Sequence, residues 1–169
     1  MRAAGVILAI ALALVLQTTL TRFIVRGTIA VDLVLVVVVY VALMSGPVTG
    51  LLAGTVAGLL QDSLSTGVVG IGGLAKTIVG FLVGIVGTQF IVARPQPRFV
   101  VFVAATELHQ AITIGLRVTL GLRSFGTPYA AVAGQALGNA VVGVAAFQLV
   151  ELLPGAVERR RASRSRLRR

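Results

Sequence analysis

The stretch that decides the fold runs from Ile29 to Met44 and reads IAVDLVLVVVVYVALM, with Asp32 as its only charged residue. A valine-rich run of this kind suits a buried β-strand in a water-soluble protein. In lipid, however, a single strand leaves its backbone N–H and C=O groups without partners, so a helix is favoured. The prediction for this segment therefore depends on the medium that surrounds it.

The composition indicates that this medium is lipid. The chain has 169 residues, of which 57% are hydrophobic and 12% are charged, whereas a soluble domain is about one quarter charged. Seven of the basic residues are arginines within the last eleven positions, so the rest of the chain is nearly free of charge. A chain of this length cannot bury so much apolar surface in one aqueous core. The predicted fold class is an all-α polytopic membrane protein.

About six transmembrane helices in one bundle are expected, because a spanning helix needs about 20 mainly apolar residues. Two prolines, Pro95 and Pro97, are expected to break the chain between the fourth and fifth helices. Pro154 and Gly155 are expected to end the sixth. Residues 1–155 would then form the transmembrane domain, and residues 156–169 a basic, disordered cytoplasmic tail. The expected spans are Ala3–Leu20, Ile29–Met44, Pro47–Leu60, Ile71–Ala93, Phe99–Leu122 and Tyr129–Leu153.

Six spans place both termini on one side of the membrane, and the arginines indicate which side. The side of the termini holds Arg2, Arg94, Arg98 and the seven tail arginines, while the opposite side holds Arg22, Arg26 and Arg123. Cytoplasmic segments carry the excess of basic residues, so both termini are predicted to be cytoplasmic. Five spans are possible but would separate Arg2 from the tail.

The basic tail favours a membrane surface over nucleic acid. Formal net charge is +10, but the tail contains no aromatic side chain that could stack on a base. Arginines beside a transmembrane helix are typical of topology determinants and of binding sites for anionic lipid. We therefore expect anionic lipid, and no nucleic acid, as the partner of the tail.

Glycines recur every fourth residue along the third predicted helix, at Gly50, Gly54 and Gly58. Such a face lets another backbone approach closely, which is how helices associate in lipid. The face could pack inside the bundle, or it could dock the helix of a partner together with the nearby Asp62. In the second case, leucine at Gly54 should disrupt partner binding while the protein still inserts.

Charged residues in or near the spans need partners, because charge is costly at membrane depth. Asp32 begins the second helix and Asp62 ends the third. Both are interpreted as helix-end and loop hydrogen-bonding groups near the outer interface. Lys76 lies close to the same surface and could pair with Asp62.

A polar stripe follows the fifth helix, formed by Glu107, Gln110, Thr113 and Arg117. These residues share about one third of the helix circumference, so they should face the interior or another polar helix. One interpretation is interhelical hydrogen bonding with Gln135, Asn139 and Gln148 of the sixth helix. The alternatives are a pocket for a small ligand and a proton path.

No catalytic, metal or cofactor site is predicted. Glu107 and His109 are two residues apart and point to different faces of a helix, so they would make a poor acid–base pair. One histidine and no cysteine disfavour a zinc site. The glycine cluster at residues 70–73 lacks the strand and spacing of a phosphate-binding loop. The chain is therefore predicted not to be an enzyme.

Several short motifs stand out in the first half of the chain: Gln17-Thr18-Thr19, Asp32-Leu33, Gly46-Pro47, the glycines up to Asp62, Gly70, and Thr77-Ile78-Val79-Gly80. In these motifs the chain resembles the rod shape-determining protein MreD family of bacterial inner-membrane proteins. The sequence departs from the family pattern at Val31, where proline is usual, and at Lys76, where a neutral or aromatic residue is usual. Residues 99–153 carry no specific match.

The resemblance implies a non-catalytic scaffold of the complex that builds the lateral cell wall. Such proteins bind the bitopic protein MreC and, through it, act with MreB, the glycosyltransferase RodA and its transpeptidase partner. It also implies a fold similar to the substrate-binding membrane subunits of vitamin importers. The alternative function is therefore a small-molecule-binding subunit of a transporter, with an outward-open cavity lined by Glu107, Gln110 and Arg117.

Overall fold

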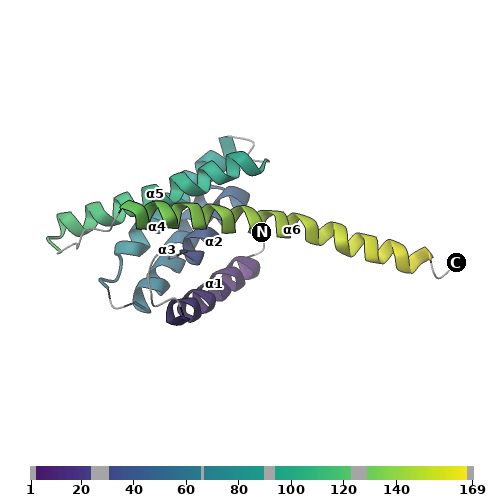
Figure 1. Cartoon of the computed structure of the whole chain (residues 1–169), viewed down its shortest axis with the longest axis horizontal. Helices are drawn as coiled ribbons and strands as arrows, with labels where there is room; N and C mark the ends of the chain where they lie inside the picture. The colour runs from purple at the N-terminus through teal and green to yellow at the C-terminus, as the bar shows by residue number, and fades with distance from the viewer. Residues whose placement is uncertain (1–2, 24–30, 66, 90–93, 123–128, 167–169) are drawn as a thin grey trace.

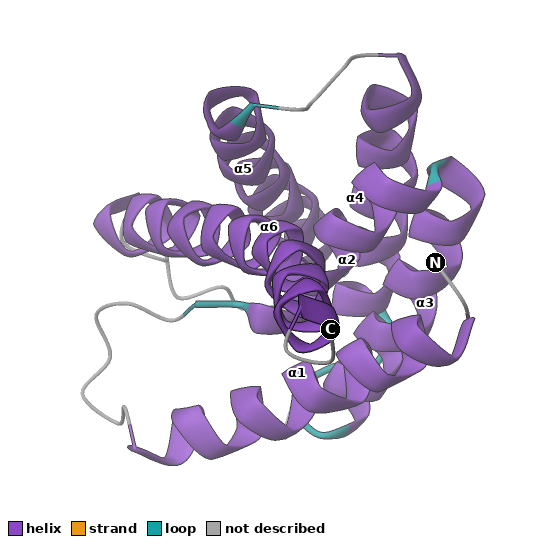
Figure 2. Cartoon of the chain, turned by 90° about the vertical axis from the view of Figure 1, so that its right-hand side faces the viewer, coloured by secondary structure: helices purple, strands orange, loops and turns teal. Residues whose placement is uncertain are grey.

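The computed structural model describes residues 3–23, 31–65, 67–89, 94–122 and 129–166 (Figure 1). Every regular element in these residues is a helix, and no strand occurs among them (Figure 2). The all-helical prediction is therefore confirmed for this part of the chain. The helices are α1 (Ala3–Phe23), α2 (Leu33–Ser45), α3 (Pro47–Ser63), α4 (Ile71–Gln89), α5 (Pro95–Thr119) and α6 (Tyr129–Arg166).

The valine-rich segment forms α2, the central helix of the bundle, which contacts all five other helices. Seven of its side chains are buried, and Val34, Val38 and Val41 have no exposed surface. Val37 and Tyr40, on the remaining face, are half-buried. A helix that is hydrophobic on every face belongs in the middle of a bundle. The uniform apolarity of the sequence is thus explained by contacts with other helices on most sides of α2.

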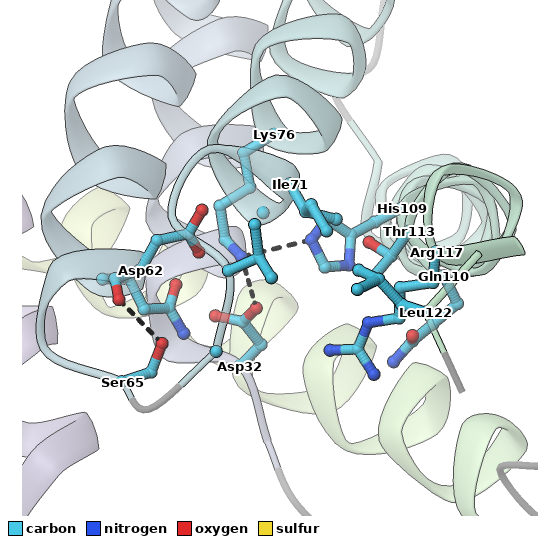
Figure 3. A pocket seen from close by; sticks show the side chains of 14 residues that line it. Asp32, Asp62, Ser65, Ile71, Lys76, His109, Gln110, Thr113, Arg117 and Leu122 are labelled. Atoms are coloured by element: carbon cyan, nitrogen blue, oxygen red, sulfur yellow. Dashed lines mark hydrogen bonds and ion pairs between the residues drawn. The ribbon is translucent and has the colours of Figure 1, made fainter. Parts of the chain in front are cut away.

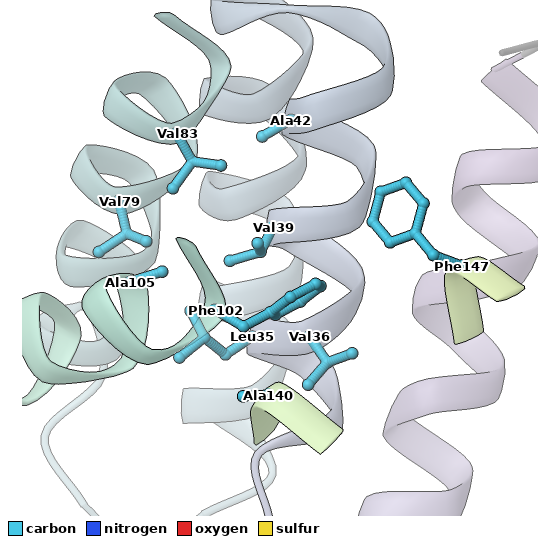
Figure 4. Close-up of a cluster of buried hydrophobic side chains, with 10 residues drawn as sticks. All are labelled: Leu35, Val36, Val39, Ala42, Val79, Val83, Phe102, Ala105, Ala140 and Phe147. Carbon is cyan, nitrogen blue, oxygen red and sulfur yellow. The ribbon is translucent and has the colours of Figure 1, made fainter. Parts of the chain in front are cut away.

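Two clusters of apolar side chains hold the other helices around α2. The first joins α2 to α4, α5 and α6 through residues that include Val39, Val79, Phe102 and Phe147 (Figure 4). The second joins α2 to α1 and α3 through Ile10, Val38 and Ala57, among others. Because the two clusters lie on different faces of α2, the position of each outer helix is fixed by apolar contact.

Three helices of the described chain are long and apolar enough to cross a membrane: α4, α5 and the part of α6 from Tyr129 to Leu152. The apolar stretches of α1 and α2 are shorter, at Ala4–Thr19 and Leu33–Ser45. Large hydrophobic side chains are exposed on the outside of the bundle, for example Leu8 (70%) and Leu149 (62%). These features show a membrane protein.

The prolines after α4 begin a helix, which corrects the expected break between Arg94 and Arg98. Pro95 is the first residue of α5, and Pro97 lies in the same first turn. The N–H groups of a first turn have no acceptor within the helix, so proline is tolerated there. Arg98 correspondingly faces inward: it is 6% exposed, pairs with Glu151 of α6 at 2.6 Å, and lies 4.3 Å from the centre of the Phe147 ring.

The last helix is longer than expected, because α6 continues through Pro154 and Gly155 as far as Arg166 (Figure 1). The sequence predicts an end at these two residues and a disordered segment beyond them. Alanine, glutamate and arginine after Gly155 favour helix, which accounts for the continuation. The division into a transmembrane domain and a separate tail remains a prediction.

Candidate functional site

Three ionisable side chains from three helices meet inside the bundle. Asp32 precedes α2 and caps it by accepting a hydrogen bond from the Leu35 N–H at 2.9 Å. Its other carboxylate oxygen lies 2.8 Å from the Lys76 ammonium of α4, which in turn lies 3.2 Å from Nε2 of His109 on α5. All three residues are less than 10% exposed. The predicted pairing of Lys76 with Asp62 is therefore wrong, and Lys76 is neutralised by Asp32 instead.

The protonation state of His109 follows from this contact. A charged ammonium has only protons to donate and no acceptor, so Nε2 of His109 must accept from Lys76. The ring proton then lies on Nδ1, and the imidazole is neutral. Nδ1 is buried and has no hydrogen-bond partner among the described residues.

A second set of hydrogen bonds ties the same site to α6. Asn139 accepts from the backbone N–H of Asp32 at 2.8 Å and donates to the hydroxyl of Thr106 at 3.1 Å. Both side chains are about 1% exposed. The sequence pattern named Asn139 as a partner for α5 but did not connect it to Asp32, because nothing in the spacing shows that residues 107 positions apart are neighbours.

A cavity of about 540 Å³ adjoins these residues at one end of the bundle (Figure 3). It lies where α2 and α4 begin and where α3 and α5 end. Asp32, Lys76 and His109 form one part of its wall, and Asp62 and Arg117 lie elsewhere around it. In Figure 3 Arg117 extends its guanidinium inward, on the same side of the cavity as His109. The remaining lining residues are Gln61, Ser65, Gly67, Val68, Ile71, Gly72, Gln110, Thr113 and Leu122.

Asp62 organises the loop between α3 and α4. One of its carboxylate oxygens accepts hydrogen bonds from the N–H groups of Gly70 at 2.8 Å and Gly73 at 3.0 Å. Gly70 has φ +106°, a conformation that side-chain-bearing residues rarely adopt. A side chain at Gly72 would overlap the other carboxylate oxygen. Asp62 thus serves as a loop and helix-end hydrogen-bonding group.

The polar stripe of α5 is divided by the structure. Gln110, Thr113 and Arg117 line the cavity, whereas Glu107 is exposed and lies outside its lining. Gln110 also donates a hydrogen bond to Gln135 of α6. A polar cavity is therefore present among the described residues, and it is lined by Gln110 and Arg117 but not by Glu107. That this cavity opens outward stays a prediction. His109 lies at the edge of the predicted stripe, but in the structure it forms part of the cavity wall and contacts Lys76.

The glycine face of α3 is occupied by α4. A methyl group at Gly54 would overlap the carbonyl oxygen of Lys76, one at Gly50 would overlap that of Gly80, and one at Gly58 would meet Gly73. Thr55 and Thr77 add a hydrogen bond of 2.8 Å between the two helices. In this structure the face therefore makes an internal contact, and a partner helix could reach it only by displacing α4.

The chemistry available at the site is polar recognition. No cluster of three or more histidine, cysteine, aspartate or glutamate residues that could hold a metal ion occurs in the part of the chain that is described. Asp32 and Lys76 neutralise one another, and Asp62 is engaged by two backbone N–H groups. The groups that remain available around the cavity are hydrogen-bond donors and acceptors and one guanidinium.

Comparison with protein-family models gives a match over residues 2–154 to the model of the rod shape-determining protein MreD. The chain belongs to this family. The match covers most of the chain, including the second half, where the sequence motifs are not specific. Membership implies a role in rod shape determination, in a family of structural proteins that is associated with the MreB/MreC shape complex.

No curated protein and no solved structure matches the chain. The structure does show how the MreD-type motifs meet in space. The amide of Gln17 donates to the carbonyl of Val31 at 3.0 Å and accepts from the N–H of Leu33 at 2.8 Å, on either side of Asp32. The motif at Gln17 in α1 is therefore hydrogen-bonded to the motif that begins α2. Asp62 and Gly70, which belong to two further motifs, are likewise joined by a hydrogen bond.

An apolar groove lies between α1 and α6, on the outside of the MreD bundle. Its volume is about 410 Å³. Leu12 and Leu16 of α1 form one wall, Val37 of α2 forms the floor, and Ala146 and Val150 of α6 form the other wall. The described parts of α1 and α6 do not contact each other across it. The groove is therefore an open apolar channel between two helices, with alanine side chains on both of its sides.

Proposed function

We propose that this MreD protein is a non-catalytic integral-membrane scaffold of the complex for lateral wall synthesis, and that it binds an MreC-like bitopic partner. The family match over residues 2–154 carries this proposal. Through that partner the protein would act with MreB, RodA and the elongation transpeptidase. The buried groups of the site pair with each other in a way that suits a rigid framework.

The groove between α1 and α6 is the proposed docking face for the membrane helix of the partner. It is lined almost wholly by apolar side chains, and Ala9, Ala13 and Ala146 leave room for a helix to approach. A bitopic partner contributes one helix, which fits a channel bounded by two helices. This assignment replaces the glycine face of α3, which α4 covers.

We further infer that all six helices lie in the inner membrane, as one bundle with both termini in the cytoplasm and a fold like that of importer subunits. Exposed apolar side chains on α1 and α3, such as Ile7, Leu8 and Leu52, support contact of these shorter helices with lipid. With this orientation the cavity opens on the outer side. The arginines after Gly155 would then lie beside anionic lipid of the inner leaflet.

Substitution in the groove tests the docking face. Ala146 lines the groove, whereas its neighbour Ala145 is exposed outside it. Overfilling a packed contact costs about 1–3 kcal/mol, so Ala146→Leu should lower the recovery of an MreC-type partner about ten-fold. Ala145→Leu is the matched control and should leave recovery unchanged. Co-purification from membranes in mild detergent measures the effect, and equal recovery with both variants would reject the groove.

The scaffold function itself is tested by the identity of the proteins that co-purify with the unmodified chain. MreC and wall synthases are expected. Recovery of a transporter energy-coupling module in their place would favour the small-molecule-binding subunit.

A further inference from the structure

Buried polar atoms without a hydrogen-bond partner are concentrated in residues that line the cavity at the end of the bundle. Four buried side-chain atoms lack a hydrogen-bond partner among the described residues, and three of them belong to residues that line this cavity: Gln61 Oε1, His109 Nδ1 and Thr113 Oγ1. Buried polar groups in proteins are almost always satisfied. Their concentration at one cavity therefore indicates that its contents supply the missing hydrogen bonds.

The donors among these groups lie on α5. His109 is 8% exposed, and its contact with Lys76 leaves the Nδ1 proton as a donor. The Thr113 hydroxyl, one helical turn further on, can also donate. Arg117 follows after another turn, and the described residues contain no carboxylate within ion-pair distance of its guanidinium. One edge of α5 thus presents two neutral donors and a cation to the cavity.

Acceptors are contributed by α3. The Gln61 carbonyl oxygen is buried without a partner. One carboxylate oxygen of Asp62 is used by Gly70 and Gly73, and the second lies next to Gly72 in the cavity wall. A ligand that spans the cavity would therefore need an acceptor-rich anionic group at α5 and a donor at α3.

We propose that the cavity binds a polar ligand with an oxyanion, held by Arg117, His109 and Thr113, and with a hydroxyl or ammonium donor that reaches Gln61 and Asp62. Guanidinium groups match the planar pairs of oxygens in carboxylate and phosphate. The volume of about 540 Å³ is within the range of small-molecule sites. This proposal is independent of the partner-binding function, because the apolar groove is lined by other residues.

Two sources could supply this chemistry, since the cavity lies at an end of the bundle. One is a free solute, and the other is the headgroup of a lipid at the membrane surface. sn-Glycerol 3-phosphate, with one phosphate and two hydroxyls, is a suitable soluble probe. Phosphatidylglycerol carries the same chemistry on a lipid. Glycerol lacks the oxyanion and serves as the control compound.

The experiment measures the thermal unfolding midpoint of the purified full-length chain in detergent, with each probe added over a range of concentrations. Arg117→Gln removes the exposed cation at the cavity and should weaken binding at least ten-fold. Arg94→Gln, at the opposite end of α5 and also exposed, makes the same change in charge and should have no effect. Thr113→Val should weaken binding several-fold.

Stabilisation by sn-glycerol 3-phosphate that depends on Arg117 would support a free solute. Stabilisation by phosphatidylglycerol alone, with the same dependence, would support a lipid headgroup. An absence of stabilisation by both probes, or equal responses of the Arg117→Gln and Arg94→Gln variants, would overturn the proposal and indicate a cavity filled by water. Comparison of the variants without probe shows whether either substitution alters folding.

Discussion

Lys76 is a buried cation, and its contacts in the structure explain how its charge is accommodated. Its ammonium lies between the Asp32 carboxylate and the His109 ring, with 3% of the residue exposed. A buried charge is tolerated only when it is paired and hydrogen-bonded. Lys76 and Asp32 therefore depend on each other, and α2, α4 and α5 meet at this pair.

Removal of one member of the Asp32–Lys76 pair should lower the free energy of unfolding much more than removal of both members. Asp32→Asn leaves the Lys76 cation buried without a counter-ion, and we expect a loss of about 3–5 kcal/mol in the free energy of unfolding. The double variant Asp32→Asn with Lys76→Met has no buried charge, retains a side chain able to cap α2, and should recover most of this loss. Circular dichroism during thermal unfolding in detergent measures both.

Glu107→Gln is the matched control for these variants, because Glu107 is an exposed carboxylate. It should leave the unfolding midpoint unchanged. If Asp32→Asn unfolded at the same temperature as Glu107→Gln, the buried ion pair would not be a structural link.

Helices α3 and α4 pack backbone against backbone, and this contact depends on glycine. Gly50, Gly54 and Gly58 bring the two backbones together at three successive turns. Close approach of this kind replaces the hydrophobic drive that helices lack in lipid. The contact also places Asp62 at the end of α3 within reach of Gly70 and Gly73.

Alanine substitutions at Gly54 and Gly115 compare the contact between α3 and α4 with an open helix face. A Cβ atom at Gly54 would overlap the Lys76 carbonyl, so Gly54→Ala should destabilise the protein by about 1–3 kcal/mol. Gly115 of α5 has nothing within 4 Å of the same atom, and Gly115→Ala should be neutral or stabilising by up to about 1 kcal/mol. Equal unfolding midpoints for the two variants would contradict close packing of α3 on α4.

As a whole, the molecule is asymmetric between its two ends. The cavity, Asp32, Asp62 and Arg117 lie at one end, and the first turn of α5 with Arg94 lies at the other. The predicted orientation places the first end outside the cell. Both the opening of the cavity and the position of the basic tail depend on this orientation.

Single cysteines can test the orientation directly, because the chain contains none. Ser65 and Gln96 are exposed and lie before and after α4. A membrane-impermeant maleimide should label Ser65→Cys in intact cells but label Gln96→Cys only after the membrane is opened. The reverse pattern would show that the topology is the opposite of the predicted one. Labelling of both cysteines in intact cells would show that α4 does not cross the membrane.

Several features of this protein follow from its sequence alone. The low content of charge and the long apolar runs predict helices in lipid, because a backbone without water must satisfy its hydrogen bonds locally. Turn residues such as Gly46 and Pro47 predict the start of α3. The MreD motifs predict the family. Each of these features depends either on residues that are close together in the sequence or on the composition of the whole chain.

The tertiary structure decided which polar groups meet. Lys76 pairs with Asp32 and not with Asp62, and Asn139 reaches the start of α2 from α6. The face of α3 that could have docked a partner packs on α4. Spacing along one helix determines which residues share a face, but it does not determine which helix lies opposite that face, because the arrangement of helices depends on packing over the whole bundle.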